Sequence, residues 1–224
     1  MDSFSKWHLS NPNIPITIFV IGDMMQQSEF VIWLEKLLIQ SKEVNGNITV
    51  GCHGWSHRSW SAWPRDDDGF TKALRNSKQH IIKVVGKAWR PWFRAPAGYI
   101  APWMAEILAA EDFEVDTSVN PSFLTKGKIG DGNNWNDVYT AIHEAGLVER
   151  PWLTSRLFGL QFPACGPALF IPLLAFLARR AWFRANKHDF VSEIELSNSE
   201  VKVLTVYWHL LDHARINGKW EPPL

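Results

Sequence analysis

The sequence predicts an α/β fold with mostly parallel strands, because segments typical of strands and of helices alternate along the whole chain. The first strand, Ile16–Gly22, is a continuous apolar run that ends in glycine, as expected for a strand buried on both faces. The next segment places Phe30, Trp33, Leu34, Leu37 and Leu38 on one face of a helix. No repeat or linker divides the 224 residues, so we expect a single domain over residues 1–224.

The remaining elements follow the same alternation. Strands are expected at 48–50, 92–96, 113–119, 147–152 and 201–208, which with the first makes six, and helices at 70–85, 102–112, 138–145 and 167–183. Gly86 ends the first of these helices, and Pro102 suits the first turn of the second. Residues 3–9 are interpreted as the end of a helix before the first strand.

Composition excludes several classes of protein. Hydrophobic residues make up 46% and charged residues 21%, with 23 basic and 23 acidic side chains, so no nucleic-acid partner is expected. Two cysteines, Cys52 and Cys165, exclude a disulfide scaffold and are expected to be small buried residues. The count of 13 Trp fits either a bulky aromatic core or stacking on sugar rings.

No membrane span or targeting segment is expected. The most apolar stretch, Pro167–Ala178, is shorter than the roughly 20 residues that a span needs. Together with Arg179 and Arg180 it suits either a packed surface helix or an amphipathic, interfacial one. No signal peptide begins at Met1, so a cytoplasmic protein is expected unless a targeting signal precedes the expected incomplete amino terminus.

Two histidines directly follow the predicted strand 48–50. His53 and His57 could hold one metal ion if the backbone turned into a helix there, because residues i and i+4 share a helix face. Two structural histidines in a loop are the alternative. Candidate functional side chains at or near the carboxyl ends of predicted strands, where parallel barrels gather such groups, are His53, His57, Arg94, Asp116 and His209.

These pieces resemble the polysaccharide deacetylase family, the carbohydrate esterases with NodB homology. The segments that carry the resemblance are Ile16–Gly22, the His-x-x-x-His motif of His53 and His57, Arg94-Ala95-Pro96, Val115–Val119 and Tyr207–Asp212. The strand at Val115–Val119 and the segment Phe162–Phe183 are similar to the branch found in exopolysaccharide and O-antigen loci. The resemblance spans nearly the whole chain.

The resemblance implies a distorted (β/α)₇ barrel, similar to a TIM barrel, that removes the acetyl group from an N-acetylated sugar or polysaccharide. It implies a hydrolase acting on C–N bonds other than peptide bonds, and less often on an O-acetyl ester. A divalent metal, usually Zn²⁺, would polarise the carbonyl and activate water. His53 and His57 would be metal ligands, Arg94 would hold the catalytic carboxylate and His209 would be the general acid. Asp116 and Asp212 would support these groups, and Asp212 is either a brace for His209 or a surface carboxylate.

The family's first strand, which ends in two aspartates, has no counterpart before Ile16. No base and no third metal ligand are identified, and Asp2 and Asp23 are weak substitutes. We therefore expect a barrel without its first strand, in a domain incomplete at its amino terminus. The alternative is a catalytically inactive member of the same fold that binds carbohydrate.

Overall fold

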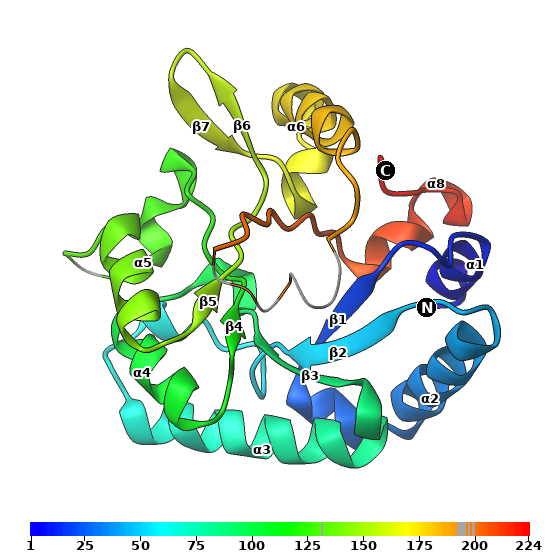
Figure 1. The fold of residues 1–224 in the computed structure, drawn as a ribbon, viewed down its shortest axis with the longest axis horizontal. Coiled ribbons are helices and arrows are strands. Elements are labelled where there is room, and N and C mark those ends of the chain that lie inside the picture. The colour runs from blue at the N-terminus through cyan, green and yellow to red at the C-terminus, as the bar shows by residue number, and fades with distance from the viewer. Residues whose placement is uncertain (131, 192–195, 197, 199) are drawn as a thin grey trace.

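Five parallel strands form the central sheet, in the order β1-β2-β3-β4-β5 (Figure 1). The structure is a computed structural model that describes residues 1–130, 132–191, 196, 198 and 200–224. The strands are β1 (Ile16–Val20), β2 (Ile48–Cys52), β3 (Trp89–Phe93), β4 (Val115–Asp116) and β5 (Val148–Glu149). Each strand pairs in parallel with the one before it in the chain, so all carboxyl ends meet at one edge of the sheet. The predicted α/β class with a parallel sheet is confirmed.

Helices connect successive strands and cover the outside of the sheet (Figure 1). The helices are α1 (Asp2–Ser10), α2 (Ser28–Glu43), α3 (Asp67–Val85), α4 (Trp103–Ala110), α5 (Trp135–Glu144), α6 (Pro172–Ala185) and α8 (Arg215–Gly218). The residues at helical spacing in α2 are all buried, as the sequence predicts. Helix α1 confirms the expectation of a helix before the first strand.

Local sequence explains where the helices begin and end. The Asp66 carboxylate caps α3 by accepting a hydrogen bond from the Gly69 amide, and Gly86 ends that helix at a positive φ of 51°. Asn134 and Asp137 form a reciprocal capping box at the start of α5. These signals are local, so the sequence alone places the helices within a few residues.

The expected strand at 201–208 is wrong. Its one ladder contact is an isolated parallel bridge between Thr205 and Trp152. Residues 201–208 run beside Pro151, whose nitrogen has no hydrogen to donate to a strand ladder. Further along the segment, the Tyr207 carbonyl accepts a hydrogen bond from the Gly166 amide. Of the six strands predicted, the other five form the sheet.

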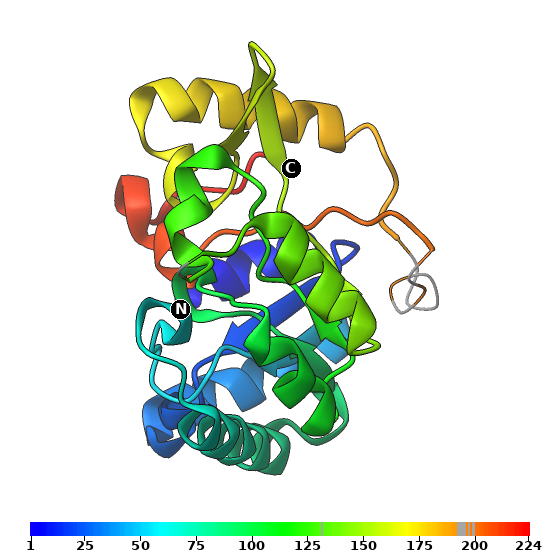
Figure 2. The same cartoon turned by 90° about the vertical axis from the view of Figure 1, so that its left-hand side faces the viewer.

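A hairpin that the sequence analysis did not predict lies beside α6. Strands β6 (Thr154–Leu157) and β7 (Leu160–Pro163) pair antiparallel, and Figures 1 and 2 show them next to α6, at the opposite end of the molecule from α3. This end has its own small hydrophobic cluster around Trp182 and Trp220. The main cluster fills the space between the sheet and helices α1 to α5. No helix among the described residues is long and apolar enough to cross a membrane.

Candidate functional site

Polar residues follow three of the strands and lie side by side beyond the edge of the sheet. The amides of His53, Arg94 and Thr117 continue the ladder by donating to the last carbonyls of β1, β2 and β3, respectively. The parallel register therefore brings together residues that are about 20 to 40 positions apart in the chain. This is the edge where parallel α/β proteins place their functional groups.

His53 is fixed in one tautomer. Its Nδ1 lies 2.7 Å from the Arg94 carbonyl oxygen, which can only accept, so Nδ1 carries the hydrogen and Nε2 has the free lone pair. Burial lowers the pKa of His53 to about 3, and the bond to the Arg94 carbonyl only partly offsets this. The positive charge of Arg94 lowers the pKa of His53 further. A neutral imidazole with a free Nε2 is the form that binds metal ions.

His57 approaches His53 through a bend rather than a helix. The two ring centroids are 5.0 Å apart with an interplanar angle of 71°. Gly54 has a φ of 75° and His57 a φ of 55°, so the chain turns back on itself within the motif. The helix that the spacing of His53 and His57 suggests does not form here. The two imidazole rings are nevertheless close to each other.

Arg94 is buried among aromatic rings. Its guanidinium carbon lies 4.6 Å from the ring centroid of Phe19, 4.9 Å from that of Tyr207 and 5.5 Å from that of Trp152. Its Nε and Nη2 donate to the Thr117 hydroxyl at 2.9 and 2.6 Å. Burial lowers the pKa of Arg94 to about 10, so it stays charged at neutral pH. In the described part of the chain no carboxylate forms an ion pair with it.

His209 and Asp212 form a pair at the same end of the sheet. Asp212 is buried, and its Oδ2 accepts from the His209 amide at 2.9 Å and lies 3.5 Å from the His209 Nδ1. The other oxygen accepts from Arg215 Nε at 3.0 Å. The His209 ring itself is largely exposed. Of the two alternatives for Asp212, this geometry favours the brace for the imidazole over a surface carboxylate.

Asp116 takes part in a buried acidic pair and does not contact the histidines. Its carboxylate accepts from the Ser118 amide and hydroxyl at 2.8 and 2.6 Å. Glu149 is its register partner on β5 and accepts from the Val119 amide at 3.3 Å. Burial raises the pKa of both carboxyls, and the charge of Asp116 raises that of Glu149 further. The positive charge of Arg94 acts in the opposite direction on the pKa of both carboxyls.

The described residues supply two candidate metal ligands and no third. Among them, no three His, Cys, Asp or Glu side chains are grouped closely enough to hold a metal ion. Asp2 lies in the first turn of α1, and Asp23 donates its amide to the Trp55 carbonyl but adds no ligand to such a group. The imidazoles suit a divalent cation in chemistry, yet an enzymatic zinc site ordinarily has three protein ligands.

Three site residues were missed from sequence. Tyr207 and Trp152 face the Arg94 guanidinium, and Glu149 faces Asp116. The ring of Tyr207 fits only because Gly166 has no side chain, since a Cβ there would lie 2.5 Å from a ring carbon. Glu149 lies inside the predicted strand 147–152, and only the structure shows that it is the last residue of β5. Both cysteines are buried as predicted.

These features define a class of protein. It has an α/β fold with two histidines and an arginine enclosed by aromatic rings at the carboxyl edge of its parallel sheet, beside the His209–Asp212 pair. The family model for polysaccharide deacetylase matches residues 8–115. The segment that carries His53, His57 and Arg94 therefore belongs to the polysaccharide deacetylase family, which confirms the resemblance. Asp116, His209 and Asp212 lie outside the matched residues.

A solved structure from Mycobacterium smegmatis, of a protein assigned as a polysaccharide deacetylase, has a similar fold with a TM-score of 0.51 and 19% sequence identity. The similarity covers 96% of this chain and 65% of that one, so this chain spans just under two thirds of its length. At this identity the likeness supports the fold alone. No curated protein matches the chain.

Proposed function

We propose that this protein is a metal-dependent deacetylase that hydrolyses the acetamide of an N-acetylated sugar in a cell-surface polysaccharide or its precursor. The observation that carries the proposal is the His53–His57 pair, with His53 locked in the tautomer that leaves Nε2 free. The family match over the segment that contains both histidines and Arg94 supports the same chemistry. The exopolysaccharide branch is proposed from the motifs around Val115–Val119 and Phe162–Phe183.

In this proposal His53 and His57 are two of the metal ligands, and the ion is Zn²⁺. A bound divalent metal would polarise the acetyl carbonyl and lower the pKa of a water molecule. The chain's own contribution to that site is the two imidazoles and the bond that orients His53. No described carboxylate occupies the position of a base, so no step is assigned to one.

His209 is proposed as the general acid that protonates the leaving amine. Its ring is exposed to solvent, while the buried Asp212 carboxylate lies beside Nδ1 and orients the ring. Arg94 is proposed as a positioning residue, because its carbonyl holds His53 and its guanidinium is held by Thr117. Asp116 would compensate the buried charge of Arg94.

The test is a pair of measurements on the same variants: zinc binding by calorimetry and acetate release from an N-acetylglucosamine oligosaccharide. We expect His53→Ala to abolish both. His143→Ala, which removes an exposed histidine from α5, is the matched control and should change neither. Zinc binding or acetate release that persists at the parent level in His53→Ala would overturn the proposal.

A catalytically inactive carbohydrate-binding protein is the second candidate. It is favoured by the lack of a third ligand in the described part of the chain and by the exposed indole of Trp63, which could stack on a sugar ring. Sugar binding that survives chelation, is lost in Trp63→Ala and is accompanied by no acetate release would favour this candidate over the enzyme.

A further inference from the structure

One continuous segment of the chain, 151–187, contains no acidic side chain. Its five cations are Arg156, Arg179, Arg180, Arg184 and Lys187. Because the whole chain balances at 23 basic and 23 acidic residues, the remainder has 18 basic against 23 acidic. Positive charge is therefore gathered on the hairpin β6–β7 and helix α6, which pack together.

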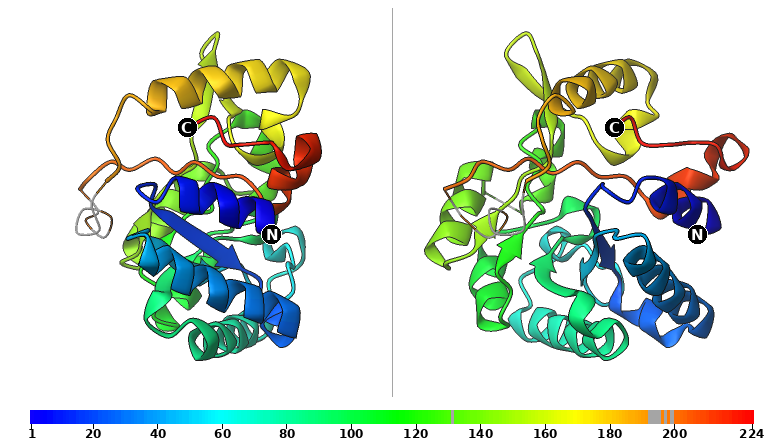
Figure 3. Two further views of the ribbon diagram at one scale, coloured as in Figure 1. Left: turned by 90° about the vertical axis from the view of Figure 1, so that its right-hand side faces the viewer. Right: turned by 45° about the vertical axis from the view of Figure 1, so that its right-hand side comes forward.

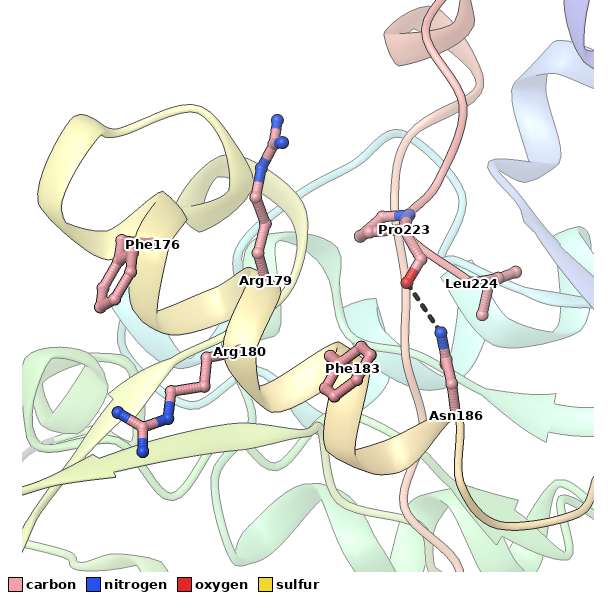
Figure 4. A pocket seen from close by; sticks show the side chains of 7 residues that line it. All are labelled: Phe176, Arg179, Arg180, Phe183, Asn186, Pro223 and Leu224. Carbon is pink, nitrogen blue, oxygen red and sulfur yellow. Dashed lines mark hydrogen bonds between the residues drawn. The ribbon is translucent and has the colours of Figure 1, made fainter.

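The outward face of α6 combines these cations with large apolar side chains. Leu173, Phe176 and Phe183 are 72, 64 and 68% exposed, while the opposite face buries Ala178 and Trp182. Arg180 and Lys187 continue the same outward stripe, and the Lys187 ammonium lies 5.2 Å from the centroid of the Phe183 ring. In Figure 4 Arg179 and Arg180 leave the helix in opposite directions, on either side of the exposed phenylalanines.

The end of α6 is fixed by the carboxyl terminus of the chain. Asn186 Nδ2 donates to the Pro223 carbonyl at 2.9 Å, and Pro223 and Leu224 line a hollow beside Phe183 (Figure 4). This contact, with the Trp182 indole that donates to the Ala164 carbonyl at 2.6 Å, holds the helix with its apolar stripe outward.

The tip of the neighbouring hairpin adds a further exposed aromatic ring. Phe158 and Gly159 occupy the two-residue turn, and Phe158 is 95% exposed at a φ of 49°. A bulky side chain is unfavourable at positive φ, where Asn or Gly is preferred. Figures 2 and 3 show the hairpin beside α6 at one end of the molecule. The stability of the turn therefore does not explain why a phenylalanine occupies position 158.

We propose that α6 and the tip of the β6–β7 hairpin form a docking surface for an anionic lipid bilayer. The charge favours this occupant: arginines and lysine that flank exposed Phe and Leu side chains match the negative headgroups and the apolar layer beneath them. A second copy of the chain is less suited, since a symmetric contact would oppose the same arginines. This inference does not depend on the deacetylase proposal.

The experiment is sedimentation of the full chain with vesicles of phosphatidylglycerol and phosphatidylcholine, compared with phosphatidylcholine alone. We expect binding to the anionic vesicles only, weakened by added salt. Phe176→Ser combined with Phe183→Ser should weaken binding by about tenfold or more, because both apolar anchors are lost. The matched control is Ile32→Ser with Ile39→Ser, which removes side chains 64 and 60% exposed on α2, and should bind as the parent does.

Phe158→Asn separates docking from folding. Asn is better suited to the turn, so its thermal stability should equal or exceed that of the parent while vesicle binding falls. The proposal is overturned if the parent does not bind anionic vesicles, or if the α2 control loses binding as strongly as the α6 variant. A concentration-dependent dimer that the α6 variant abolishes, without vesicle binding, would identify a second copy as the occupant instead.

Discussion

His53 is kept neutral by its surroundings, which make it suitable as a ligand. A carbonyl oxygen at 2.7 Å fixes the hydrogen on Nδ1, and burial lowers the pKa to about 3. The histidine therefore needs no deprotonation before it binds a cation at neutral pH. The carbonyl belongs to Arg94, which follows β3, so Arg94 orients the ring of His53, which follows β2.

The Asp116–Glu149 pair predicts a dependence of stability on pH. Burial raises the pKa of Glu149 well above its ordinary value, so the native state holds a proton that the unfolded chain releases. The stabilisation is complete below the ordinary pKa of about 4.3 and is lost as pH rises through the native pKa. Glu149→Gln should thus raise the free energy of unfolding at pH 8, by about 1 kcal/mol or more, and not at pH 4.

Urea denaturation at the two pH values measures this effect. Glu144→Gln, on the exposed side of α5, is the control and should follow the parent at both. A Glu149→Gln variant whose stability relative to the parent is the same at pH 4 and pH 8 would contradict a raised pKa.

We expect a substitution of Asp212 to affect the catalytic role of His209 more than the stability of the fold. Asp212→Asn keeps an oxygen that can accept from the His209 amide but removes the negative charge beside the ring. If the deacetylase proposal holds, acetate release should fall by about tenfold to a hundredfold. The pH profile of kcat should also change, which a purely structural role would not cause. Asp68→Asn, an exposed change in the first turn of α3, should leave both unchanged.

Helix α5 illustrates how local sequence fixes an element. The Asn134 side chain accepts from the Asn136 amide at 2.8 Å, and Asp137 accepts from the Asn134 amide at 2.8 Å. Asn134→Ala should lower the free energy of unfolding by about 1 kcal/mol, the usual cost of losing a helix cap. Asn136→Ala, two positions on and exposed, is the control for thermal denaturation. Equal melting temperatures for the two variants would contradict the capping role.

The strands behave differently from the helices, because their length depends on neighbours. The segment 113–119 is predicted to be a long strand, but only Val115–Asp116 pairs. Beyond it the Thr117 hydroxyl accepts from Arg94, and the Ser118 hydroxyl accepts from the Ala95 amide and donates to Asp116. Side-chain bonding replaces the ladder at the edge where the candidate site lies.

At the scale of the whole molecule, Phe93 connects the sheet to its helices. It is fully buried on β3 and packs edge-on against Phe70 of α3 and against Phe113. Phe93→Ala should lower the free energy of unfolding by about 3 to 5 kcal/mol through lost burial and a cavity. Phe158→Ala, at the exposed hairpin tip, should change it by less than about 0.5 kcal/mol. Similar urea midpoints for both variants would contradict this account of the core.

The sequence by itself determined the α/β class, the helices α1 to α6 and five of the strands, because periodicity and caps are local properties. It also selected His53, His57 and Arg94 as candidates, since they follow predicted strands that form, whereas His209 was selected at the end of a predicted strand that does not form. Only the tertiary structure decided that a bend brings the histidines together, that Tyr207 and Trp152 enclose Arg94, and that 201–208 is not a strand. Those outcomes depend on contacts between residues far apart in sequence, which no local pattern records.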